Sequence, residues 1–402
     1  MMSFMQSRPR LFLMIGALYL SQGIPLGLAM EALPTLLRRD GAALQALAWL
    51  PLVGLPWVLK FLWASQVDNR WSPAWGRRRS WILPMQLLAL GCLLILAMVG
   101  TDDAALGILL LGLASLASAT QDIATDGLTA EHFSSDDLAR ANAIQVGGTM
   151  VGFFLGGPGC LTLGAYVGSR GAVLGLAGLV GFSLLMVSLW REPPVKLARQ
   201  DRACLRGFLR RPGAWPLVWA AGLSAMAVAA PYGLAKLMLV DAGWAPEAIG
   251  RLGLAGGAVT LLLGCGGGAW LAERIGPRNA LGLGLLASAA AATAWIALAA
   301  GEPGPLGAFL AQALASFGAG AASVGLMTLA MRFAQDGRQA GTDMTAVQSA
   351  RDLGEVMASA GMTALAAQLG YSVSFGVSLG GALLVLILLL LTFTPGRAKP
   401  VA

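Results

Sequence analysis

Twelve apolar runs, each close to the length that crosses a bilayer, limit what this chain can fold into. A helix needs about 20 apolar residues to span the hydrocarbon core, where it satisfies all of its own backbone hydrogen bonds. Only 12% of the 402 residues are charged, whereas soluble domains carry roughly a quarter. The runs predict an all-α polytopic membrane protein with twelve transmembrane helices at 11–36, 43–66, 80–100, 104–130, 139–166, 170–190, 213–238, 247–272, 277–299, 304–332, 342–368 and 371–393.

Lysine and arginine indicate which ends of these spans face the cytoplasm. When both termini are placed inside, 20 of the 27 basic residues fall in cytoplasmic segments and 4 in outer loops. Cytoplasmic loops of membrane proteins carry such an excess of basic residues. The sequence therefore predicts that both termini are cytoplasmic, with Lys60, Lys236 and Arg351 left inside the spans.

The chain divides into two halves of six spans. The basic segment 191–211 separates them, and short motifs recur across it in nearly one register: Ile24–Ala29 recurs as Ala230–Ala235, and Ala143–Gln145 as Ala346–Gln348. A parallel repeat of six spans about an axis normal to the membrane resembles the major facilitator fold. We expect a six-helix half at 1–190, a basic cytoplasmic linker at 191–212 and a second six-helix half at 213–402.

The fourth span ends on an unusual acidic motif, Gln121–Asp126, after an apolar run that is free of charge. Asp122 and Asp126 are four residues apart, which places them on one face of a helix about 6 Å apart along its axis. An ionised carboxylate at membrane depth costs a few kcal/mol or more. Two interpretations remain open, namely a structural ion pair that locks two helices and a site that handles protons or substrate.

We expect Asp122, deeper in the membrane, to carry the proton, and Asp126 to act as a gate bound to an arginine. Lys60 and the arginines that follow the second span are the expected partners of the two acids. The full set of candidate proton-coupling or gating residues is Asp122, Asp126, Lys60, Asp68, Glu31, Arg351 and Glu355. The candidate substrate contacts are Gln22, Trp57, Gln121, Tyr232, Lys236 and Gln348.

Other classes of site find little support in the sequence. The single histidine, His132, lies in a predicted loop, and the four cysteines match neither a metal-site spacing nor a disulfide framework. No nucleotide-binding loop is present. We therefore predict no catalytic residue, metal or cofactor, and no nucleic-acid partner despite the net charge of +7. Transport would run on an ion gradient.

Three motifs resemble those of the AmpG-related permeases. They are Leu18–Pro25, then Lys60–Trp63 with Asp68 and Gly76–Trp81, and then Gln121–Ile123 with Asp126. One proline usual in the second motif is Ser65 here. The opening motif and the twelve-span length are most similar to the RhtX/FptX siderophore permease branch of this group.

The resemblance implies a function as well as a fold. It implies a monomeric, proton-coupled secondary transporter in the bacterial inner membrane that imports a ferric siderophore of the pyochelin or rhizobactin kind. Two alternatives remain open. One is a muropeptide permease like AmpG, and the other is a membrane scaffold or signalling protein that does not transport.

Overall fold

The computed structural model describes residues 8–33, 53–100, 103–193, 202–244, 246–301 and 303–392. Within these ranges the chain is mostly helical, with turns, short irregular stretches and one isolated bridge between Ser72 and Gly76. Eight helical segments of the described residues are long and apolar enough to cross a membrane. The predicted all-α membrane class is thus confirmed. The first part of the predicted second span, up to residue 52, lies outside the described residues.

The helices form two compact units. Unit 1 contains residues 1–208 and 331–349, and unit 2 contains residues 209–330 and 350–402. Two helices are therefore shared, because the last turn of α15 (Pro305–Gln335) and the first turns of α16 (Ala340–Leu369) belong to unit 1. The predicted domain boundaries, with a linker at 191–212, stay a prediction.

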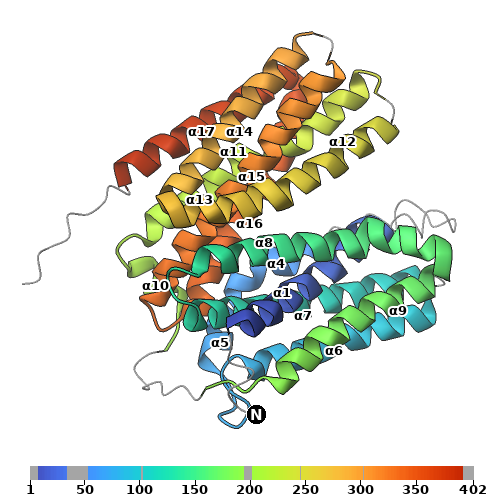
Figure 1. Ribbon diagram of the computed structural model, residues 1–402, viewed down its shortest axis with the longest axis vertical. Helices are drawn as coiled ribbons and strands as arrows, with labels where there is room; N and C mark the ends of the chain where they lie inside the picture. Colours follow the sequence, from blue (N-terminus) through green and yellow to red (C-terminus); the bar gives the residue numbers. More distant parts are fainter. Residues whose placement is uncertain are drawn as a thin grey trace, which may run out of the picture. The chain divides into compact units, whose positions relative to one another are not determined.

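Unit 1 holds the first six predicted spans. Helix α1 packs along α8, and α6 packs against both α7 and α9 (Figure 1). An apolar core joins residues from α1, α6, α7 and α9, and it includes Ile24, Leu93 and Leu111. The elements are α1 (Arg8–Gly27), η1 (Leu28–Ala32), α4 (Leu55–Leu59), η3 (Lys60–Leu62), α5 (Ala64–Asn69), α6 (Arg79–Val99), α7 (Ala104–His132), α8 (Leu138–Phe154), η4 (Leu155–Gly159) and α9 (Cys160–Leu189).

Glycine lets α1 and α8 approach each other closely. A Cβ atom placed on Gly152 would lie 2.0 Å from the carbonyl oxygen of Leu20, and one on Gly23 would lie 2.1 Å from that of Thr149. No side chain fits in this space, so the two backbones are in direct contact. Small residues promote such packing in membranes, where burial from water does not drive helix association.

A turn inside α9 separates the predicted fifth and sixth spans. Gly168 has φ 77° and ψ 159°, and these angles are not helical. Positive φ is accessible to glycine without the steric cost that a Cβ imposes. The helix before Gly168 continues α8 and η4, and the helix after it returns along α6.

Unit 2 is built from the later helices around its own apolar core. Helix α17 packs against α11 and α14. Trp295 and Phe375 stack in this core, with ring centroids 6.1 Å apart. The elements are α11 (Ala214–Asp241), α12 (Pro246–Val259), η5 (Thr260–Gly267), α13 (Gly268–Ile275), α14 (Pro277–Ala299) and α17 (Tyr371–Thr392), with most of α15 and α16. The short helix α10 (Leu205–Arg210) straddles the boundary between the units.

Candidate functional site

The acids of α7 lie on a fully buried stretch of the helix. The helix begins at Asp103, whose carboxylate accepts a hydrogen bond from the backbone N–H of Leu106 at 3.0 Å and so caps the first turn. From residue 117 to residue 130 every side chain is buried. Asp122 is 3% exposed and Asp126 is 0% exposed. Both side chains therefore face the interior of the protein.

Asp122 forms an ion pair with Lys60, as expected. Lys60 is the first residue of η3, a short 3-10 segment between α4 and α5, and it is 1% exposed. Its ammonium group also lies 5.1 Å from the ring centroid of Trp57, at a cation–π distance. Burying either charge alone would be costly, so each partner offsets the desolvation of the other.

Asp126 is held by neutral groups. The Tyr19 hydroxyl of α1 donates to Oδ1 at 2.8 Å, and the Gln145 amide of α8 donates to the same oxygen at 2.7 Å. The Gln348 amide of α16 donates to Oδ2 at 2.6 Å. The sequence predicts an arginine at this carboxylate, and the structure instead places three uncharged donors there.

Gln348 connects the two acids. Its amide nitrogen donates to Asp126, and its amide oxygen accepts a hydrogen bond from the ammonium group of Lys60. Both contacts require the same orientation of the amide group. Gln348 was expected to touch substrate, and here it belongs to the hydrogen-bond network of the acids. We call Tyr19, Lys60, Asp122, Asp126, Gln145 and Gln348 the acid network.

More polar side chains of α1 and α7 form hydrogen bonds beside the acid network. Gln22 donates to the Thr125 hydroxyl at 3.2 Å, and Gln121 donates to the carbonyl oxygen of Leu18 at 3.3 Å. The amide oxygens of Gln22 and Gln145 are buried and find no donor in the described part of the chain. Unit 1 therefore contains a buried region rich in amide and hydroxyl groups.

A second cluster forms where α5, the start of α6 and the end of α7 meet. Arg78 lies 2.6 Å from Asp68 and 2.5 Å from Glu131, and Arg77 lies 2.8 Å from Glu131 and 3.4 Å from Asp68. The carboxylate of Glu192 accepts the backbone N–H groups of Arg78 and Arg79 at 2.8 to 2.9 Å. This accounts for the start of α6, because these N–H groups have no partner within the helix. We call Asp68, Arg77, Arg78, Glu131 and Thr342 the loop cluster.

The loop cluster includes the first turn of α16. Asp68 accepts hydrogen bonds from both the backbone N–H and the hydroxyl of Thr342, each at 2.7 Å. Burial raises the pKa of the Asp68 carboxyl, but the charges of Arg78 and Arg77 and the hydrogen bonds from Thr342 outweigh it. The pKa therefore lies below its ordinary value, and the group is ionised at neutral pH.

The remaining predicted residues lie elsewhere. Arg351 and Glu355 belong to unit 2, where they approach to 3.8 Å with side chains 31% and 57% exposed. Lys236 is an exposed residue of α11 in the same unit. The side chains of Glu31 and Tyr232 are outside the described part of the structure.

Several residues in or beside the two clusters are not predicted by the sequence. Tyr19 and Gln145 were noticed only as parts of motifs, and Glu131, Glu192 and Thr342 were not singled out. Tyr19 sits three residues before Gln22, on the same face of α1. That spacing was the one signal available for Tyr19.

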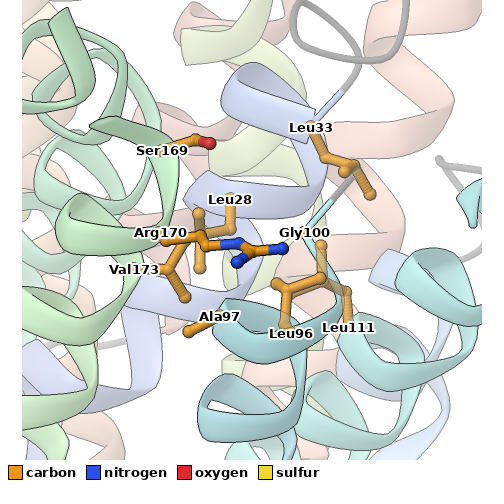
Figure 2. Close-up of a pocket in the computed structure, with 9 residues that line it drawn as sticks. All are labelled: Leu28, Leu33, Leu96, Ala97, Gly100, Leu111, Ser169, Arg170 and Val173. Carbon is orange, nitrogen blue, oxygen red and sulfur yellow. The ribbon is translucent and has the colours of Figure 1, made fainter. Parts of the chain in front are cut away.

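One apolar pocket of unit 1 lies apart from both clusters. Arg170 extends across it toward Leu96 and Gly100 (Figure 2). Its lining shares no residue with the acid network or the loop cluster. The lining residues are Leu28, Leu33, Leu96, Ala97, Gly100, Leu111, Ser169, Arg170 and Val173.

The chemistry available to the acid network is proton and substrate binding. No three histidine, cysteine or acidic side chains gather into a metal-binding group within the described ranges. The network offers instead two carboxylates, one ammonium group and a set of amides and hydroxyls, all inside a bundle of membrane-length helices. Intramembrane ionisable groups of this kind mark ion and substrate pathways.

Known proteins share both sequence and fold with this chain. The anhydromuropeptide permease of Escherichia coli K12 is 27% identical over 307 residues, which cover 73% of this chain and 61% of the permease. An uncharacterized membrane protein of Saccharomyces cerevisiae is 34% identical over 171 residues, covering 37% of this chain and 30% of the yeast protein. The matches thus span less than two thirds of these curated relatives.

Solved structures show the same fold at low identity. The human organic anion transporter MFSD10 superposes with a TM-score of 0.74 at 17% identity, covering 95% of this chain and 99% of that one. FucP in the outward conformation gives 0.70 at 13% identity, covering 96% and 98%. Residues 11–359 match the family profile of the Major Facilitator Superfamily. This chain therefore belongs to the Major Facilitator Superfamily and has the fold of its secondary transporters.

Proposed function

We propose that this protein is a proton-coupled importer of an anhydromuropeptide-like solute. The observation that carries the proposal is the acid network, in which two carboxylates of the membrane-length helix α7 are buried together with the ammonium group of Lys60. Such groups are expensive in a membrane and are kept where they bind ions or substrate. A solute pump without a nucleotide-binding loop draws on an ion gradient, and a carboxylate is the group that can carry a proton.

The substrate class rests on similarity and on the chemistry of unit 1. The Escherichia coli relative is an anhydromuropeptide permease. Amides and hydroxyls suit a solute made of amino sugars and peptide, because each buried polar group of the solute needs a partner. The buried glutamines Gln22, Gln121 and Gln145, two of which have amide oxygens without a donor in the described residues, supply such partners.

The ferric siderophore was the first substrate expected from the sequence. Neither sequence relative described above is named as a siderophore transporter, and the bacterial homologue of the iron transporter ferroportin, at 18% identity, shares only the fold. The muropeptide alternative is therefore the better supported. A scaffold without transport would have little reason to retain charged groups that are costly to bury.

The distribution of basic residues also indicates how the protein is oriented in its membrane. We place the protein in the bacterial inner membrane with both termini in the cytoplasm, since the basic residues concentrate in the segments on that side. Import then runs from the periplasm to the cytoplasm with the inward proton gradient.

Uptake into proteoliposomes tests the proposal. We expect a labelled anhydromuropeptide to accumulate when the outside is made acidic, and to equilibrate without accumulation when the pH is equal on both sides. Unlabelled anhydromuropeptide should compete and a ferric siderophore should not. Accumulation of the siderophore instead would restore the first expectation, and no accumulation of either would overturn the proposed function.

A further inference from the structure

A row of three oxygen contacts runs from Asp126 along α7. Oδ1 of Asp126 lies 2.8 Å from the Tyr19 hydroxyl, which lies 3.1 Å from the hydroxyl of Thr129. The Thr129 hydroxyl donates to the backbone carbonyl of Thr125 at 2.8 Å. Tyr19, Thr125, Asp126 and Thr129 are all buried. All three distances are those of hydrogen bonds between oxygen atoms, or slightly longer.

The number of hydrogens available to these three contacts depends on whether Asp126 is protonated. Three contacts require three hydrogens, and the two hydroxyl groups supply one each, while the carbonyl supplies none. When Asp126 is ionised, the Tyr19 hydrogen points to Asp126 and the Thr129 hydrogen points to Thr125. The contact between Tyr19 and Thr129 then joins two acceptors with no hydrogen between them. A proton on Asp126 provides the third hydrogen.

When Asp126 is protonated, each of the three contacts holds one hydrogen, and the donors all point from Asp126 toward Thr125. Asp126 donates to the oxygen of Tyr19, Tyr19 donates to Thr129, and Thr129 donates to the Thr125 carbonyl. Oδ2 of Asp126 remains an acceptor for the Gln348 amide, and Gln145 stays within hydrogen-bond distance of Oδ1. No buried donor loses its partner when the proton arrives.

The side chains that face Asp126 differ in charge from the side chain that faces Asp122. The charged groups near it are Asp122 on the same helix and Lys60 on η3, which bind each other. Helix α1 contributes the titratable Tyr19, while α8 and α16 contribute the neutral amides of Gln145 and Gln348. Asp122 thus has a cation as its direct partner, whereas the direct partners of Asp126 among the described residues are neutral.

We propose that Asp126 is the acid that takes up and releases the transported proton. Tyr19 and Thr129 are then positioning residues: the hydroxyl hydrogen of Tyr19 reverses as the proton arrives, and the hydroxyl oxygen of Thr129 accepts it. This inference rests on the proposed proton-coupled function. The proton adds to Oδ1, the Tyr19 hydrogen turns from Asp126 to Thr129, and no other bond changes. Release restores the first arrangement. The assignment differs from the expectation from sequence, which gave the proton to Asp122.

The variant Thr129→Val should destabilise only the form of the protein in which Asp126 is protonated. It keeps the shape of the side chain but removes the acceptor that Tyr19 needs only when Asp126 is protonated. We expect the pH at which uptake is half-maximal to fall by about 0.5 to 1 unit. A shift of this size corresponds to the free energy of one hydrogen bond. Thr129→Ser retains the hydroxyl and should keep the wild-type profile.

Thr260→Val is the matched control, because Thr260 is a buried threonine of η5 that donates to the carbonyl four residues earlier, at 3.0 Å. It should leave the pH profile unchanged. An unchanged profile in Thr129→Val, or an equal shift in Thr129→Ser, would overturn the proposal. A wild-type protein whose uptake ignores the proton gradient would instead overturn the proposed function.

Infrared pH-difference spectra of the substrate-free protein give a readout independent of transport. A protonated carboxyl group absorbs apart from carboxylate, so its band reports the titrating acid. We expect the band to persist in Asp122→Asn and to vanish in Asp126→Asn. Loss of the band in Asp122→Asn alone would assign the proton to Asp122 and overturn the proposal.

Discussion

Asp68 and Thr342 are 274 residues apart in the sequence, yet the carboxylate of Asp68 accepts both the backbone N–H and the hydroxyl of Thr342. The contact lies at the first turn of α16, where unpaired N–H groups and the helix dipole favour a negative charge. The same carboxylate binds Arg78. Asp68 thereby joins α16 to the start of α6 within unit 1.

Asp68→Asn should destabilise unit 1. The amide is neutral and leaves Arg78 buried beside fewer negative charges, and removing one partner of a buried pair costs about 3–5 kcal/mol. The folded-state pKa of Asp68 lies below that of the unfolded chain, so its stabilisation is present at neutral pH and is lost as pH falls below about 4. Thermal unfolding in detergent at pH 7 measures the effect. Asp136→Asn changes an exposed acid nearby and serves as the control, and equal unfolding temperatures would contradict the expectation.

Lys60 and Asp122 should show strong coupling in a double-mutant cycle. Lys60→Met leaves Asp122 buried without its partner and should cost about 3–5 kcal/mol of stability. Adding Asp122→Asn removes the unpaired charge and should recover much of that loss. Unfolding midpoints of the wild type, both single variants and the double variant give the coupling energy. Additive effects would show that the pair is not coupled.

The contact between α1 and α8 should tolerate no side chain at Gly152. In Gly152→Ala the new methyl group meets the carbonyl of Leu20, and overpacking of this kind costs about 1–3 kcal/mol. Gly178→Ala is the matched control, since an added Cβ on this glycine of α9 meets no atom of the described structure within 4 Å. It should be neutral or stabilise by up to about 1 kcal/mol through helix propensity. Unfolding temperatures rank the two variants, and a loss that is equal in both would refute the packing argument.

Cysteine labelling checks the orientation of the spans. In a background without the four native cysteines, a membrane-impermeant thiol reagent added from the periplasmic side should label Asp102→Cys and not Arg202→Cys. The reason is that the outer loops carry few basic residues while the segment around Arg202 carries many. The reverse pattern would place both termini in the periplasm.

The sequence by itself determined the class of fold and the place of the acids. Apolar runs of bilayer length require helices, because a helix is one of the few structures that satisfies its backbone in hydrocarbon. The cost of charge in that setting singled out Asp122 and Asp126, and their spacing of four put them on one face of α7. It also led to Lys60 as the partner of Asp122, because few cations lie in the spans.

Only the tertiary structure decided which neutral groups meet the acids. Tyr19, Gln145 and Gln348 come from three helices. Neutral polar side chains of these types give no signal in a sequence that marks them as site residues. For the same reason the expected arginine at Asp126 was wrong, since Arg77 and Arg78 turn to Asp68 and Glu131. Helix periodicity fixes which face a residue occupies, whereas the packing of one helix on another fixes which faces meet.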